Sequence, residues 1–307
     1  MNSSDVDIEH MRTAIGRLLD HDNRYGGDAV AAAAVQVWRT GRRKLDRGLV
    51  PDGSHAEYVS TVAEVAQIAG WLLFDAGERE SSRAAFVESQ MLARHAGDRP
   101  MKWFALDMLA MHSIEYHRPD ESLRIADDVL SDSRVPPRVA LLARIRKARA
   151  LADTGSRRRA MREFTAARSG LEDSITTRDP SWTWWVDERE LSGHEGESLL
   201  ALGEPNAAVP KLRRALDLAT ESNSNRRVIL YYSVALLTAY ASGRAWRECE
   251  STLLSMPPLL EEVASGRSRR RLRATLHEIA RTPGSPHWLS DLAREMTAAP
   301  QLSGSCC

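Results

Sequence analysis

Apolar residues recur at helical spacing along most of the chain, and the pattern is most regular between residues 64 and 96. The apolar positions of the first half of this stretch are Val65, Ile68, Leu72 and Leu73. They lie on one face of a helix, on which Gly70 permits a neighbouring helix to come close. Gly77 predicts a tight turn. The second half then places small, large and small side chains on one face of a second helix, at Ser82, Phe86 and Ser89. The stretch therefore predicts a hairpin of two helices.

The same hairpin pattern repeats along the chain. A small residue before the turn, followed by small, large and small residues at fixed positions after it, is the tetratricopeptide pattern. Successive turn residues are about 38 to 40 positions apart, with one longer interval before the fourth: Gly77, His117, Gly155, Gly203 and Gly243. The copies around His117 and Gly243 match the pattern less well. Because only its neighbours can cover the apolar face of each hairpin, we predict an all-α, tetratricopeptide-like superhelix of antiparallel helix hairpins.

This pattern divides the chain into four parts. Residues 1–53 are expected to form an N-terminal helical capping pair. Residues 54–256 are expected to hold five hairpins, with a tryptophan-rich insert at 172–187. We expect C-terminal capping helices over residues 257–299 and a disordered tail over 300–307.

The composition narrows the class of protein. The chain has 42 basic and 42 acidic residues, so its net charge gives no long-range attraction to nucleic acid or to an anionic membrane. Three cysteines are too few for a disulfide framework or a thiolate zinc site. The acidic N-terminus lacks the apolar core of a signal peptide, and no apolar run reaches the roughly 18 residues of a membrane span. We expect a cytoplasmic protein without a cofactor or membrane association.

Several segments together resemble a known family. They are residues 18–27, 64–71 and 75–77, then Trp182, Asp187, Glu188, Glu190 and Leu191, and residues 268–273. In these segments the chain resembles the C-terminal tetratricopeptide-repeat sensor region of bacterial Cro/XRE-type helix-turn-helix transcriptional regulators. The resemblance covers nearly the whole chain and implies a regulatory role. None of the segments is a catalytic signature.

The chain departs from the family's pattern at its N-terminus. Family members carry a DNA-binding domain before the sensor region, whereas Met1 precedes the first matching residue, Ile8, by only seven positions. A recognition helix does not fit in that space. We therefore expect either a fragment of a regulator or a stand-alone derivative, with no direct DNA binding.

The first helix of each hairpin is expected to line the concave surface of the superhelix. The candidate ligand-binding residues there are Trp71, Phe74, Asp75, Phe104, Asp107, Met111, Glu115, Arg149, Glu190, Glu197 and Tyr240. They combine aromatic faces, carboxylates and one arginine. Such a groove suits a small, partly apolar molecule with a positive group, or an extended peptide with a basic residue. The competing interpretation is that individual members only pack against adjacent helices.

Histidines and carboxylates cluster twice, but their spacing argues against a metal site. His112, Glu115 and His117 share one helix, and Glu190 and His194 share another. His112 and His117 are five positions apart, which is about 140° round a helix, so they do not converge. A third firm ligand is not evident. We therefore expect solvated side chains and no metal.

Two further features have two interpretations each. The run from Arg267 to Arg273 has the charge to bind phosphates, but apolar residues interleave it at helical spacing. For this run we expect a solvated capping helix. The segment with Trp182, Trp184 and Trp185 is either a lid over the groove or a hydrophobic plug between repeats.

Two classes of function fit the sequence. The first is a stand-alone regulatory protein that binds a small molecule or peptide and acts through a protein partner or a second copy of itself. The second is a biosynthetic enzyme derived from the regulator scaffold, in which Asp107, Glu115 or Glu190 provides acid/base chemistry on an amphiphilic substrate. No histidine stands at a sequence spacing from Cys249 that indicates a catalytic Cys–His pair. We therefore expect a buried or unreactive thiol there. We favour the binding protein, and a scaffold that joins two proteins is also compatible with the pattern.

Overall fold

The computed structural model describes residues 3–222, 225–299 and 302. In these residues all regular structure is helical, with fifteen α-helices and two short 3-10 helices. The α-helices of the N-terminal half are α1 (Ser3–Tyr25), α2 (Ala31–Asp46), α3 (Asp52–Ala76), α4 (Arg79–Ala96), α5 (Arg99–Glu115), α6 (Pro119–Ser131), α7 (Pro137–Asp153) and α8 (Arg157–Ser169). The rest are η1 (Glu172–Ser174), η2 (Ser181–Trp185), α9 (Glu188–Ala201), α10 (Pro205–Ser222), α11 (Arg226–Ser242), α12 (Trp246–Ser255), α13 (Pro257–Glu262), α14 (Gly266–Arg281) and α15 (His287–Ala298).

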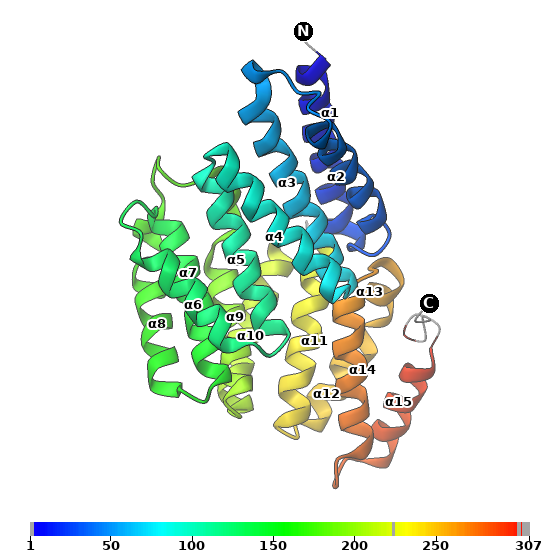
Figure 1. Ribbon diagram of the computed structural model, residues 1–307. Helices are drawn as coiled ribbons and strands as arrows, with labels where there is room; N and C mark the ends of the chain where they lie inside the picture. Colours follow the sequence, from blue (N-terminus) through cyan, green and yellow to red (C-terminus); the bar gives the residue numbers. More distant parts are fainter. Residues whose placement is uncertain (1–2, 223–224, 300–301, 303–307) are drawn as a thin grey trace.

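Ten of the helices pair into five antiparallel hairpins that stack side by side (Figure 1). The pairs are α3–α4, α5–α6, α7–α8, α9–α10 and α11–α12, and each packs on the next along the chain. Helices α1 and α2 pack against the first hairpin, and α14 packs against the fifth. The prediction of an all-α, tetratricopeptide-like fold is confirmed.

Left-handed backbone conformations form the turns within the hairpins. Gly77 and Gly155 have φ of 89° and 73°, values that glycine adopts without steric cost. The second and fifth hairpins turn without glycine in this conformation, since His117 and Arg244 both have φ of 57°. The turn predicted at Gly243 is therefore displaced by one residue, and Gly243 itself keeps a φ of −84°.

Glycine also allows the two helices of the first hairpin to pack closely. A Cβ added to Gly70 would lie 2.6 Å from ring atoms of Phe86 on α4. Phe86 is fully buried, so its ring has little room to move aside. The close approach predicted at Gly70 is present, and the partner is the second helix of the same hairpin.

The superhelix closes on itself because its C-terminal helices return to the N-terminal ones. Helix α14 packs against α3, and α1 packs against α11 (Figure 1). Main-chain hydrogen bonds join the two ends: Ala264 N donates to Tyr25 O at 2.7 Å, and Asp28 N donates to Ala264 O at 3.3 Å. We call the contacts of residues 22–28 with residues 225–227 and residues 263–268 the ring closure.

The tryptophan-rich insert lies against the second hairpin and leaves one indole in solvent. Trp182 stacks on Phe104 of α5, with ring centroids 4.6 Å apart, and its Nε1 donates to Pro100 O at 3.2 Å. Trp184, two positions on, is 73% exposed. The insert therefore packs between repeats through Trp182 and presents Trp184 outward.

Little of the C-terminal tail belongs to the described residues. The predicted tail, residues 300–307, lies outside the described residues apart from Leu302, which is buried and whose carbonyl oxygen accepts a hydrogen bond from Arg273 at 3.2 Å. Among the described helices, none combines the length and the apolar character that crossing a bilayer requires.

Candidate functional site

Charged side chains from three successive hairpins meet on the concave face of the superhelix. We call this face the inner wall. Arg146 of α7 forms two hydrogen bonds with Asp107 of α5, from Nε to Oδ1 at 2.8 Å and from Nη2 to Oδ2 at 3.0 Å. His194 of α9 accepts a hydrogen bond at Nδ1 from Arg149 Nη1 (3.1 Å), and its Nε2 lies 2.8 Å from Glu190 Oε1. The inner wall is thus joined by charge pairs as well as by apolar packing.

The surroundings of this cluster fix its protonation. Burial lowers the pKa of His194 and the Arg146 guanidinium lowers it further, so that it falls to about 4 in spite of the Glu190 carboxylate. Burial raises the pKa of Glu190, but His194 and Arg146 outweigh this effect and lower it to about 2. At neutral pH His194 is uncharged and Glu190 is an anion.

Glu197 continues the inner wall from α9 to α14. Its Oε1 accepts a hydrogen bond from Arg271 Nη1 at 2.6 Å, and Arg149 Nη2 lies 3.9 Å from its Oε2. Burial raises the pKa of Glu197, but the charges of Arg271 and Arg149 lower it to about 2. One ionised carboxylate therefore joins the third and fourth hairpins to the C-terminal helices.

Asp75 and Arg267 face one another where α3 meets α14. Arg267 Nη2 lies 3.7 Å from Asp75 Oδ1. The guanidinium also lies over the rings of Phe74 and Tyr231, 4.8 and 4.6 Å from their centroids. Aromatic faces attract a cation that has left water. The rings of Phe74 and Tyr231 therefore stabilise the buried Arg267 guanidinium in addition to the Asp75 carboxylate.

The prediction of a solvated face for residues 267–273 is wrong at Arg267 and Arg271. Arg267 is only 7% exposed, and Arg271 pairs with the buried Glu197. The two arginines are four positions apart and so lie on the same side of α14. The same helical spacing also fits a charged stripe that faces the interior. Here the two arginines of this stripe contact partners on α3, α9 and α11.

Trp71 links the inner wall to the ring closure. Its Nε1 donates to Asp22 Oδ2 at 2.9 Å, and the same oxygen accepts a hydrogen bond from Arg227 Nε at 3.1 Å. The Arg227 guanidinium lies 4.7 Å from the Trp71 ring centroid. These three side chains connect α3, α1 and α11.

The remaining predicted ligand-binding residues have different surroundings. Met111 is half-buried in the apolar cluster that holds Phe74, and the Glu115 carboxylate lies 4.0 Å from Arg270. Tyr240 lies apart from these residues, because it is 4% exposed in the apolar core and its hydroxyl bonds Arg213 of α10. The structure brings together on the inner wall Trp71, Phe74, Asp75, Asp107, Arg149, Glu190 and Glu197.

The predicted histidine cluster on α5 is not solvated at His112. This ring is fully buried, with Nε2 3.0 Å from Arg79 O and Nδ1 3.1 Å from Arg118 Nη2. The Phe74 ring lies against it at 5.9 Å between centroids. His117, in contrast, is exposed at the turn. Among the described residues no group of three or more His, Cys, Asp or Glu side chains is placed to hold a metal ion.

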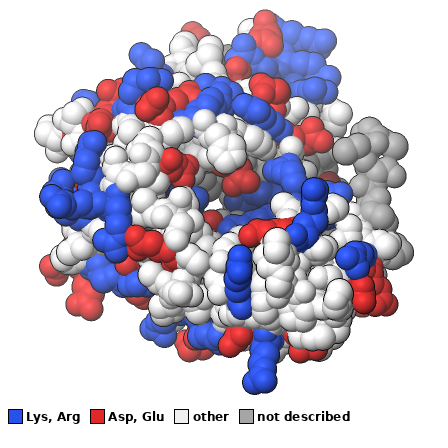
Figure 2. Space-filling view, turned by 90° about the horizontal axis from the view of Figure 1, so that it is seen from below, with Lys and Arg blue, Asp and Glu red and all other residues white. Residues whose placement is uncertain are grey.

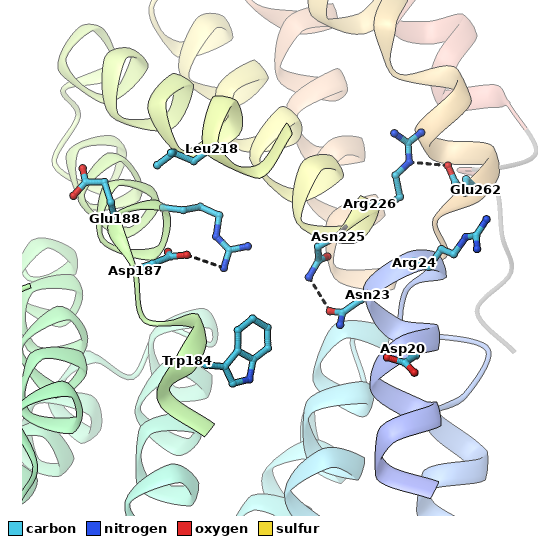
Figure 3. Close-up of a pocket in the computed structure, with 11 residues that line it drawn as sticks. Asp20, Asn23, Arg24, Trp184, Asp187, Glu188, Leu218, Asn225, Arg226 and Glu262 are labelled. Carbon is cyan, nitrogen blue, oxygen red and sulfur yellow. Dashed lines mark hydrogen bonds and ion pairs between the residues drawn. The ribbon is translucent and has the colours of Figure 1, made fainter. Parts of the chain in front are cut away.

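A cavity of about 930 Å³ opens where the two ends of the superhelix meet the fourth and fifth hairpins (Figure 3). We call it the mouth pocket. Its lining comes from α1, η2, α9, α10, α11 and α13 and comprises Asp20, Asn23, Arg24, Trp184, Asp187, Glu188, Arg189, Leu218, Asn225, Arg226 and Glu262.

Polar pairs brace the walls of the mouth pocket. Asn225 Nδ2 donates to Asn23 Oδ1 at 2.7 Å, and Arg226 Nε donates to Glu262 Oε2 at 2.8 Å (Figure 3). The Trp184 indole points into the open space between these walls (Figure 3). The pocket therefore offers an exposed aromatic face, side-chain amides and charges of both signs.

Adjacent residues connect the mouth pocket to the inner wall. Asn23 lines the pocket, while its neighbour Asp22 binds Trp71 inside the superhelix. Arg226 likewise lines the pocket, while Arg227 bonds Asp22. The pocket lining and the ring closure are therefore formed by neighbouring residues of the same two helices, α1 and α11.

The centre of the superhelix is visible from one end. The face drawn in Figure 2 is hollowed near its middle, and acidic and basic side chains border the hollow. Both signs of charge thus reach the surface where the inner wall ends.

Sequence reasoning missed Arg146 and most of the mouth pocket. Arg146 has its acidic partners 39 and 44 positions away, at Asp107 and Glu190. These separations are close to the length of one repeat. Such pairs could therefore be found by aligning the polar positions on the inner faces of successive repeats. The pocket residues of α1 and α11 are brought together only by the ring closure.

No model of a known protein family matches the chain, and no curated protein matches it. Among solved structures, the chain is similar to a Rap protein in a crystal structure of its complex with competence and sporulation factor. The TM-score is 0.57 at 11% sequence identity, over 96% of this chain and 88% of that chain. The similarity shows that the helical-repeat fold is shared over almost the whole length of both chains.

Proposed function

We propose that the protein is a regulatory binding module that takes a short peptide in the mouth pocket and acts through a protein partner. The observation that carries this proposal is the position of the pocket. Its walls come from both ends of the superhelix, so one bound molecule contacts segments that only the ring closure holds together. Occupancy then favours one arrangement of the ends over another, which is the requirement for a ligand to shift a conformational equilibrium.

The chemistry of the lining favours a peptide over a purely apolar small molecule. Small-molecule sites are mainly hydrophobic with a few polar groups. The mouth pocket has one aromatic side chain, Trp184, and one aliphatic side chain, Leu218, among carboxylates, arginines and asparagines. An extended peptide supplies backbone donors and acceptors for amides, together with side chains and termini for charges of both signs.

Individual groups of a peptide have matching partners in the lining. Asn225 donates to Asn23 through Nδ2, which leaves the Asn23 Nδ2 donor for a peptide carbonyl. Asp20 is exposed and suits a basic side chain, and Arg24 is exposed beside it on α1 and suits a carboxylate. Trp184 provides the aromatic face on which an apolar or cationic side chain packs.

Two similarities support the regulatory part of the proposal. The sequence resembles the sensor region of Cro/XRE-type regulators, and the fold is shared with a Rap protein crystallised with competence and sporulation factor. In both cases a helical-repeat scaffold is the basis of the comparison. We propose that this chain uses the same kind of scaffold for a signal that a partner protein receives.

The acid/base alternative gains no support from its candidate residues. Asp107 is held by two hydrogen bonds from Arg146, and the pKa of Glu190 is about 2, far below the near-neutral value that suits a general base. Cys249 is buried, and burial raises the pKa of its thiol to about 12. Asp107 and Glu190 are instead engaged in ion pairs and hydrogen bonds within the fold.

Affinity selection from a mixture of random hexapeptides, read by mass spectrometry, tests the proposal. We expect the protein to enrich a defined subset, and Trp184→Ala to weaken binding of those peptides at least tenfold. Trp288→Ala is the matched control, since Trp288 is also exposed, at 46%, but lies on α15 outside the pocket. Equal loss in both variants, or enrichment of no peptide, would contradict a peptide site at Trp184.

A further inference from the structure

The outer face of α8 carries unbalanced positive charge. Between Arg157 and Ser169 five arginines stand against one glutamate, although the whole chain has equal numbers of basic and acidic residues. Helix α8 forms one edge of the molecule in Figure 1, and Lys and Arg side chains gather at the same edge in Figure 2. The excess charge is therefore local and lies on the surface.

Among the described residues, three of these arginines have no acidic partner. The two arginines at the ends of α8 pair with glutamates of α9 and of the turn that follows it. Arg158, Arg159 and Arg162 are exposed, and in the described part of the chain no carboxylate lies within ion-pair distance of them.

Their placement is unfavourable for the helix taken alone. Arg158 and Arg162 are four positions apart, so like charges repel on one face. Arg158 and Arg159 also lie in the first turn, where the helix dipole favours acidic side chains. A partner that brings negative charge to this face relieves both effects.

A shallow hollow of about 800 Å³ runs along the same face of α8. Its lining is Arg157, Arg158, Met161, Arg162, Thr165 and Ala166. Met161 and Ala166, with the methyl group of Thr165, give it an apolar floor, and the arginines form its rim. A floor and a rim of this kind match an amphipathic segment whose acidic side chains flank an apolar stripe.

We propose that this face of α8 is a docking surface for an acidic amphipathic helix of a partner protein. Arg158 and Arg162 lie one helical turn apart, about 6 Å along the axis. Carboxylates four positions apart on a partner helix have the same spacing, and an apolar side chain between them reaches Met161. A nucleic acid fits less well, because phosphates make no use of an apolar floor.

A designed peptide pair tests the surface. One fluorescent helical peptide carries glutamates four positions apart beside leucines, and its counterpart has serines in place of the leucines. We expect the leucine peptide to bind the full chain, with the serine peptide at least fivefold weaker. Arg158→Glu/Arg162→Glu should abolish binding, whereas Arg17→Glu/Arg39→Glu, an equal charge change at exposed arginines of α1 and α2, should leave it within twofold.

Four outcomes would overturn the proposal. Equal binding of the leucine and serine peptides shows that the floor is not used. Equal loss in both double variants shows only a response to net charge. Tighter binding of single-stranded DNA than of the leucine peptide, lost in Arg158→Glu/Arg162→Glu, assigns the surface to nucleic acid. Sedimentation velocity completes the test, because a dimer that this variant converts to monomer assigns the face to a second copy of the chain.

Discussion

Arg146 and Asp107 form a two-point hydrogen-bonded ion pair between successive repeats, with the Arg146 side chain 1% and the Asp107 side chain 6% exposed. Two charges taken out of water in this way are costly, and the pair offsets that cost only while both members are present. The inner wall of the superhelix is therefore sensitive to the loss of either partner.

Arg146→Met should destabilise the fold by about 3–5 kcal/mol, because it leaves the Asp107 carboxylate buried without its partner. The double variant Asp107→Leu/Arg146→Met should recover most of that loss, since it removes both charges. Urea unfolding followed by circular dichroism measures the free energies. If the single and double variants are equally unstable, lost packing and not the unpaired charge governs this site.

Gly70→Leu should destabilise the first hairpin by about 1–3 kcal/mol, since its Cβ would lie 2.6 Å from the buried Phe86 ring. Gly16→Leu is the matched control, because nothing lies within 4 Å of a Cβ at that position of α1. Thermal unfolding compares the two variants. A melting temperature unchanged in Gly70→Leu argues against the close contact.

Gly266→Ala should loosen the ring closure, because its Cβ would lie 2.2 Å from the Ala76 carbonyl oxygen and force α14 away from α3. Hydrogen exchange of the amides in residues 22–28 and 263–268 should become faster, while exchange in α5 to α8 stays as in the original chain. Gly53→Ala, which has open space around its Cβ, is the control. Unchanged exchange at both segments would show that the closure tolerates the displacement.

His194 should make stability depend on pH between about 4 and 6.5. Its folded pKa is about 4 against an ordinary value of 6.5, so in this range the unfolded state binds more protons and stability falls as the pH is lowered. The shift corresponds to a loss of about 3 kcal/mol between pH 7 and pH 4. Urea unfolding at several pH values gives the free energy of unfolding as a function of pH. Its slope should be smaller for His194→Gln than for the control His277→Gln, which changes an exposed histidine. Equal slopes would mean that other groups cause the dependence.

The hairpins could be predicted from the sequence, whereas the ring closure could not. Gly70 and Phe86 are 16 positions apart within one repeat, so the spacing of small and large residues records their contact. The bonds of Asp28 with Gly266 and of Asp22 with Arg227 span 238 and 205 positions. No local period relates such residues, and their pairing depends on the curvature that all the hairpins accumulate.

The candidate site could also be predicted only in part from the sequence. Trp71, Asp75 and Glu197 could be placed on the inner wall by counting from the turn residues. Their partners Arg267 and Arg271 could not, because an amphipathic helix of arginines has the same pattern whether its charged stripe meets water or carboxylates. The mouth pocket depends on the ring closure and so remained outside the reach of the sequence.

Hydrogen–deuterium exchange with a peptide enriched by the affinity selection tests the central claim most directly. If a peptide in the mouth pocket acts on the ring closure, its addition should slow amide exchange at the end of α1 and the start of α11 and also across residues 263–268. Trp184→Ala should remove the whole effect. Protection confined to other surfaces of the superhelix, or protection that persists in Trp184→Ala, would contradict the account.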